Sequence, residues 1–138
     1  MVFMSNIFVD SNILIYSQDT TSSNYKRSMQ ILKGILEAGG TMVITPFVLN
    51  EIHYFFIKAV GIEKGTEAIT KILKIPNLKL IDLILTTNDI KSILRISKKY
   101  KLKTFDSFHA YYCKKLRIKK IATFDTDFDK IPWLKVIN

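Results

Sequence analysis

The chain is poor in cysteine, histidine and long apolar runs, and each shortage excludes a class of protein. A single cysteine, Cys113, excludes an internal disulfide and a cysteine-based metal cluster, so we expect it to be a small packing residue of a helix. No apolar run reaches the roughly 18–20 residues that cross a membrane. Residues 1–10 lack the basic segment of a secretory signal, and we therefore expect a cytoplasmic protein without membrane contact.

Acidic residues are also few: 12 Asp and Glu stand against 21 Lys and Arg, which leaves a formal net charge of +9. Such an excess attracts polyanions, and nucleic acid is the usual one. A lysine-rich, solvated surface explains the same charge, because most of the excess is lysine scattered along the predicted helices. Charge alone therefore favours a nucleic-acid partner without deciding the question.

What the chain does have is an ordinary globular composition, with 48% hydrophobic and 24% charged residues. Its 138 residues are enough for one continuous core, and no repeat, low-complexity tract or linker divides them. We therefore predict a single domain over residues 1–138.

Short apolar runs alternate with longer amphipathic ones. Strands are predicted at 7–9, 41–45, 78–83, 119–123 and 134–137. Helices are predicted at 23–38, 46–60, 62–74 and 87–100, with another beginning near Thr104. Thr45 is the expected N-cap of the helix that Pro46 opens, and Gly61 is expected to break it. Strands separated by helices indicate βαβ units, so the predicted fold is α/β, with a parallel sheet of about five strands covered by helices on both faces.

Polar side chains gather where the predicted strands end, which is where an open parallel sheet binds its ligands. The candidates follow the first, second or fourth strand or lie on the helix before the fourth: Asp10, Ser11, Asn12, Glu51, Asp106, Thr123, Asp125 and Asp127. We predict that four acids at these junctions converge on one cleft, namely Asp10, Glu51, Asp106 and Asp125.

Two of these acids have ordinary structural explanations. Asp10 could be a helix N-cap or a turn residue, although Ser11 or Asn12 could cap the helix alone. Asp106 complements the dipole of a helix that Thr104 would cap. His109, on the same face as Asp106, could shuttle a proton or contact phosphate, but we expect a partly buried, hydrogen-bonded histidine.

Glu51 is harder to explain structurally, because its helical neighbours are Phe47, Val48, Tyr54 and Phe55. A buried, unpaired carboxylate is costly, so this position needs a cation, a lysine or a hydrogen-bond network. We favour a functional role.

Three acids occur between residues 125 and 129. Neighbouring side chains point different ways, so the three cannot all be ligands. Asp125 is nearest the strand end and is predicted as the ligand, with Asp127 auxiliary and Asp129 at the surface or capping the next turn. Thr123 is placed to hold a neighbouring carboxylate through its hydroxyl.

Most aromatic residues are expected in the core, including Tyr54, Phe55, Phe56, Tyr111, Tyr112 and Trp133. Stacking of a nucleic-acid base on one of them stays possible.

Crowded carboxylates repel one another, and a divalent cation bound between them replaces this repulsion with attraction. Oxygen ligands, with one cysteine and two histidines in the chain, suit Mg²⁺ or Mn²⁺ rather than zinc. Such ions orient a water, make it a nucleophile and stabilise the leaving oxygen of a phosphodiester. An acidic cleft on a basic chain is therefore consistent with cleavage of nucleic acid.

The segments "FVDSNILIY", "TPFVLNEI", "FDSFHAYYCKKL" and "IATFDTDF", in this order, resemble a PIN-domain ribonuclease of the VapC toxin type. The resemblance covers about Ile7 to Ile137 and implies a three-layer α/β/α domain with Mg²⁺- or Mn²⁺-dependent endoribonuclease activity. It also implies an RNA substrate, a frequent homodimer and an antitoxin partner that inserts a segment into the cleft.

The family pattern places its four acids on Asp10, Glu51, Asp106 and Asp125 as metal-binding catalytic residues. Its D-[ST]-N and T-x-[DN] motifs match two further segments, which contain Ser11, Asn12 and Thr123. The segment "DSFHAYYC" is bulkier than the alanine-rich helix usual in the family.

Other functions fit parts of this pattern. A haloacid-dehalogenase-like phosphatase needs a second Asp where this chain has Asn12, and a response-regulator receiver domain needs an acidic pair at the first strand. A non-catalytic binding module explains the charge but not Glu51. A housekeeping RNA-processing enzyme or a structure-specific DNA nuclease of the PIN superfamily stays the main alternative to a toxin.

Overall fold

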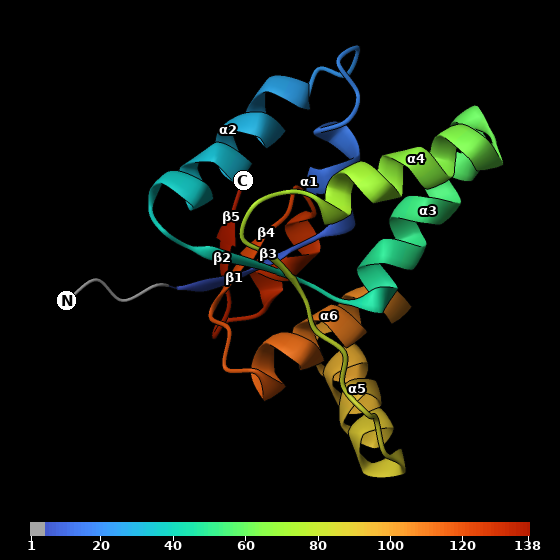
Figure 1. The fold of residues 1–138 in the computed structure, drawn as a ribbon. Coiled ribbons are helices and arrows are strands. Elements are labelled where there is room, and N and C mark those ends of the chain that lie inside the picture. The colour runs from blue at the N-terminus through green and yellow to red at the C-terminus, as the bar shows by residue number, and fades with distance from the viewer. Residues whose placement is uncertain (1–4) are drawn as a thin grey trace.

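A five-stranded parallel sheet runs through the computed structural model, which describes residues 5–138 (Figure 1). Its strands are β1 (Asn6–Val9), β2 (Thr41–Ile44), β3 (Leu78–Leu80), β4 (Lys120–Ala122) and β5 (Lys135–Ile137). They lie in the order β3-β2-β1-β4-β5, and every neighbouring pair is parallel. The first strand is therefore central, and the residues that follow it stand in the middle of one edge of the sheet.

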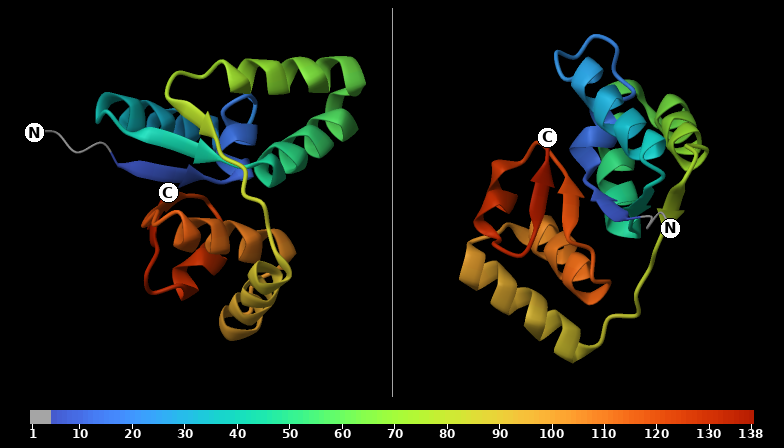
Figure 2. Two further views of the ribbon diagram at one scale, coloured as in Figure 1. Left: turned by 60° about the horizontal axis from the view of Figure 1, so that its bottom comes forward. Right: turned by 90° about the vertical axis from the view of Figure 1, so that its left-hand side faces the viewer.

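Helices cover both faces of this sheet. One face carries α1 (Ser11–Tyr16), α2 (Tyr25–Glu37), α3 (Pro46–Val60) and α4 (Ile62–Leu73), and the other carries α5 (Thr87–Tyr100) and α6 (Thr104–Lys115) (Figure 2). The chain changes face because the connection from β3 to β4 must cross β2 and β1 in the sheet order. The predicted three-layer α/β/α fold with five parallel strands is confirmed.

The core lies on both faces of the sheet, because the central strands are buried on both sides. Phe8, Val9, Val43, Ile44 and Ile121 are fully excluded from solvent. This explains why these strands appear in the sequence as continuous apolar runs rather than as alternating ones. Cys113 is buried on α6, as predicted for a packing residue.

Local signals place most helix ends correctly. The Thr45 hydroxyl accepts a hydrogen bond from the Val48 N–H at 3.3 Å, and Pro46 is the first residue of α3. Gly61 separates α3 from α4 with φ +89°, a conformation that favours glycine. None of the helices in the described range 5–138 is long and apolar enough to cross a membrane.

Two local predictions are wrong. Thr104 does not cap α6 but is its first residue, Lys103 occupies the N-cap position, and no side chain caps that end. The predicted strand 78–83 forms pairs only over Leu78–Leu80, after which the chain leaves the sheet to change face.

The expectation that aromatic residues lie in the core is right for some and wrong for others. Phe56, Tyr111 and Tyr112 are buried, whereas Tyr54 is 67% exposed and Phe55 is 45% exposed. The reason is helical geometry: α3 turns its Val48, Ile52 and Phe56 side toward the core, so Tyr54 and Phe55 lie off that side.

The α3–α4 pair packs closely at Gly65. A Cβ atom at Gly65 would lie 3.0 Å from the Ile57 backbone N and 3.2 Å from its Cα, whereas a Cβ at Gly34, on α2, would contact nothing within 4 Å. We expect Gly34→Ala to raise the free energy of unfolding by about 1 kcal/mol through helix propensity. Gly65→Ala should instead lower it by about 1 kcal/mol, because overpacking outweighs the same propensity gain.

Urea unfolding of the two variants beside the wild type checks this prediction. The two glycines are matched, since both lie inside helices and both gain one methyl group. Equal stabilisation by both alanines would contradict the close approach at Gly65.

Candidate active site

Asp10 follows β1 directly and is 4% exposed. Its Oδ1 accepts a hydrogen bond from the Ser11 N–H at 2.7 Å, which makes it the N-cap of α1. Its Oδ2 accepts another from the Thr123 hydroxyl at 2.7 Å. The sequence left helix capping and a place in the site as alternatives for Asp10. The structure shows that the same carboxylate does both.

A small hydrogen-bond network joins the ends of β1 and β4. The Asn12 amide donates to the Thr123 hydroxyl oxygen at 3.3 Å, and the Phe124 N–H donates to Asn12 Oδ1 at 3.2 Å. Thr123 also accepts from the Asp125 N–H at 3.0 Å. One threonine hydroxyl therefore orients both Asp10 and the backbone that carries Asp125, as predicted for its hydroxyl.

Glu51 reaches the same edge of the sheet from α3. Its Oε1 lies 2.8 Å from Nε2 of His109, and that nitrogen lies 3.7 Å from Oδ1 of Asp10. Glu51 is half-buried rather than buried, and the partner of its carboxylate is a histidine on α6. His109 is hydrogen-bonded as expected, but it is fully buried and stands between two predicted ligands. The feature of the sequence that could have predicted this role is that His109 lies one helical turn after Asp106, on the same face of the helix.

The acids form two adjoining groups. Asp10, Glu51 and His109 each offer one atom within 4.8 Å of the others, and Asp106, Asp125 and Asp127 do the same. The groups also act on each other, because the charge of Asp10 contributes to the pKa of Asp106. All four predicted acids thus lie in one neighbourhood, at the carboxyl ends of β1 and β4.

The three acids between residues 125 and 129 take different roles, as expected. Asp125 itself caps the short 3-10 helix Thr126–Lys130, because its Oδ1 accepts from the Asp127 N–H at 2.9 Å. Asp129 is exposed at the surface, which is one of the two places expected for it. Asp127 is partly engaged by Lys130, whose Nζ lies 3.2 Å from its Oδ1.

Burial and mutual repulsion shift the pKa values of the site. Burial raises the pKa of Asp10. Burial, followed by the charges of Asp10 and Asp125, raises the pKa of Asp106 to about 7. Burial lowers the pKa of His109, but the hydrogen bond to Glu51 and the charge of Asp10 outweigh it, so that the net shift is upward. Neighbouring carboxylates disfavour one another's ionisation, and a divalent cation bound to their oxygen atoms removes that repulsion.

Comparison with known proteins assigns the family. A family model described as "PIN domain" matches residues 7–134, which include every predicted site residue. The chain belongs to the PIN-domain family. This assignment replaces the phosphatase alternative.

Two similar proteins come from Methanocaldococcus jannaschii. "Ribonuclease VapC6" is 28% identical over 97% of both chains. "Ribonuclease VapC2" is 29% identical over 97% of this chain and 94% of its own length.

Solved structures share the PIN fold at lower identity. VapBC2 from Rickettsia felis, bound to a promoter DNA fragment, aligns with a TM-score of 0.71 at 18% identity over 96% of this chain and 98% of that one. VapC20 from Mycobacterium tuberculosis, described as a toxin that cleaves the Sarcin-Ricin loop, has a TM-score of 0.72 at 16% identity over 94% and 98%.

The pKa shifts of this PIN domain predict that its stability without metal falls as pH rises from about 4 to about 7. The ordinary pKa of Asp106 is 3.8 and its folded pKa is about 7, so the folded state holds a proton that the unfolded chain has lost. The upward shifts of Asp10 and His109 act in the same direction. The lowered pKa of Asp89 acts below this window.

Urea unfolding in EDTA at several pH values between 4 and 8 measures this loss of stability. Added Mg²⁺ or Mn²⁺ should restore stability most at high pH, where the carboxylates are free to bind it. Asp106→Asn is the control, because it keeps the side-chain shape and should flatten the pH dependence. A wild type whose stability rises through this window, or an Asp106→Asn variant with an unchanged slope, would contradict the prediction.

Proposed function

We propose that this PIN domain is a metal-dependent endoribonuclease and the toxin of a VapBC-type toxin–antitoxin pair. The observation that carries the proposal is the group of acids at the carboxyl ends of β1 and β4, where Asp10 is buried, the other acids are half-buried and the pKa of Asp106 is raised to about 7. The names of the two relatives from Methanocaldococcus jannaschii, both ribonucleases of the VapC type, support the choice of RNA.

In this proposal Asp10, Asp106, Asp125 and Glu51 bind Mg²⁺ or Mn²⁺, and Asp127 assists them. The support is chemical, since the donor set consists of carboxylate oxygens whose charges repel one another. When bound, the ion supplies a nucleophilic water at neutral pH and neutralises charge on the scissile phosphate.

The remaining side chains hold this arrangement in place. Thr123 donates to Asp10 Oδ2 at 2.7 Å, and the Asn12 amide lies 3.4 Å from the same oxygen. Ser11 places its hydroxyl 3.5 Å from Glu51 Oε2. Because His109 is buried and bonded to Glu51, it fixes the direction of that carboxylate on α3. These contacts keep oxygen atoms from three separate elements aimed at one place, which lowers the cost of reorganisation during the reaction.

In the same proposal, an antitoxin segment binds in a groove beside the acids. A groove of about 830 Å³ borders Glu51, and its wall includes the exposed rings of Tyr54, Phe55 and Phe105. Exposed aromatic side chains next to a charged cleft are typical of a surface that another protein covers. Several structural neighbours are toxin–antitoxin complexes, including one from Klebsiella pneumoniae. A homodimer and a location in the cytoplasm belong to the same proposal.

The decisive experiment measures RNA cleavage by wild type, Asp10→Asn and Glu51→Gln in Mg²⁺, in Mn²⁺ and in EDTA. We expect cleavage only with metal, and a loss of at least about 100-fold in each variant, because each removes a negative ligand without changing side-chain shape. Glu63→Gln, an exposed acid in the first turn of α4, is the matched control and should retain full activity.

Melting temperatures of all variants separate loss of chemistry from loss of fold. Equal cleavage by all proteins, or cleavage that survives EDTA, would overturn the proposal. Cleavage of structured DNA without cleavage of RNA would replace it with the DNA-nuclease alternative.

A further inference from the structure

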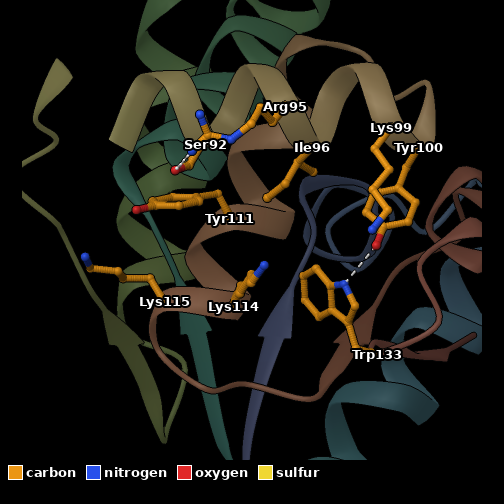
Figure 3. Close-up of a pocket in the computed structure, with 9 residues that line it drawn as sticks. All are labelled: Ser92, Arg95, Ile96, Lys99, Tyr100, Tyr111, Lys114, Lys115 and Trp133. Carbon is orange, nitrogen blue, oxygen red and sulfur yellow. Dashed lines mark hydrogen bonds between the residues drawn. The ribbon is translucent and has the colours of Figure 1, made fainter. Parts of the chain in front are cut away.

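A second pocket lies on the α5–α6 side of the sheet (Figure 3), and none of the predicted acids lines it. It has a volume of about 550 Å³ and is bordered by α5, by the last turn and a half of α6 and by the turn before β5. The residues that matter here are four cations and two aromatic rings: Arg95, Lys99, Lys114, Lys115, Tyr100 and Trp133. None of them belongs to the site proposed above.

Positive charge in this pocket is largely uncompensated. Lys115 lies 3.6 Å from Oδ1 of Asp89, a carboxylate that also accepts a hydrogen bond from Tyr111. Within residues 5–138, no carboxylate oxygen lies within 4.0 Å of the side-chain nitrogens of the other three cations, Arg95, Lys99 and Lys114. Three charges around one hollow create a positive potential that favours an anionic ligand.

The aromatic rings are held in place beside these cations. Trp133 Nε1 donates a hydrogen bond to the Tyr100 hydroxyl at 3.3 Å. Nζ of Lys114 lies 5.9 Å from the centroid of the Trp133 ring, and Nζ of Lys99 lies 5.3 Å from that of Tyr100. Cations that follow a backbone, next to rings on which bases stack, are the features that bind single-stranded nucleic acid.

Helix electrostatics explain only part of this arrangement. Lysines are favourable in the last turn of a helix, where they face its negative end, and this accounts for Lys99 and Lys114. It accounts neither for Arg95, which lies further from the end of α5, nor for the half-buried ring of Trp133. Both nevertheless line the same pocket.

The helix α6 connects the pocket with the acids. Asp106 is near its start and Lys114, eight positions later, is near its end, so the two lie about 12 Å apart along the axis. That is about four nucleotides at the spacing of roughly 3.4 Å that stacked bases have. A short single strand is therefore long enough to contact both places.

We propose that this pocket binds the phosphate backbone of a single-stranded segment of the RNA substrate, with the Trp133 ring available to a base. The inference rests on the proposed ribonuclease function, to which it adds a second contact with the substrate. The pocket then contributes to affinity for RNA, while the acids carry out the cleavage.

The experiment compares two double variants that each lose two positive charges. Arg95→Gln/Lys114→Gln alters the pocket, and Lys64→Gln/Lys71→Gln alters α4 on the other face of the sheet. All four side chains are exposed, so both variants should fold, and melting temperatures verify this. Lys99→Gln is a second pocket variant that does not depend on the first.

The readout is binding of a labelled, unstructured 16-nucleotide RNA, followed by fluorescence anisotropy in EDTA, where no cleavage occurs. We expect the pocket variant to bind about tenfold more weakly and its slope of log K against log salt to be smaller by about 1.4, the value for two lost phosphate contacts on a single strand. The α4 variant should stay within about twofold of wild type. Because Trp133 is the chain's only tryptophan, RNA should also quench its fluorescence in wild type.

Equal weakening of RNA binding by the pocket and α4 variants would overturn the inference, because the loss would then follow from the lower net charge alone. A loss of affinity for duplex DNA of the same sequence, without one for RNA, would overturn it as well. The metal-dependent cleavage assay decides the proposed function separately. A wild type that cleaves RNA, together with a pocket variant of unchanged affinity, would refute this inference alone, whereas pocket-dependent binding without cleavage would refute the proposed function alone.

Discussion

The crowding of carboxylates at one buried edge of the sheet is the constraint on which the rest of this structure depends. Asp10 is 4% exposed and is attached to the central strand, where no water can compensate its charge freely. The hydroxyl of Thr123 and the imidazole of His109 are the groups that make this placement tolerable. The same electrostatic cost makes the edge receptive to a divalent cation, so the repulsion among the carboxylates and the chemistry proposed for them have one origin.

Helix α6 links the group of acids with the basic pocket. Its first half brings Asp106 and His109 to the acids, and its last turn brings Lys114 to the basic pocket. An acidic site on a basic chain is therefore consistent, because the negative charge lies at the start of α6 and the positive charge at its end. Negative charge holds the metal in the proposed mechanism, and positive charge holds the phosphates that the metal must reach.

Much of the fold and part of the site were predictable because their signals are local. The alternation of strand and helix, the cap at Thr45 and the break at Gly61 each depend on residues a few positions apart. The prediction for the aromatic residues of α3 failed because it required knowledge of their surroundings. Tyr54 and Phe55 are large aromatic residues like Phe56, and only the rotation of α3 against the sheet decides which of the three is covered.

The sequence by itself determined that an acid, a hydroxyl and an amide follow the central strand, and that the chain carries an excess of positive charge. Only the tertiary structure decided which distant residues meet: Thr123 with Asp10 across 113 positions, and His109 with Glu51 across 58. It also decided that Trp133 closes a pocket made by α5 and α6. The physical reason is that periodicity and capping act within a few residues. Contacts between elements depend instead on strand order and on the face to which each connection crosses.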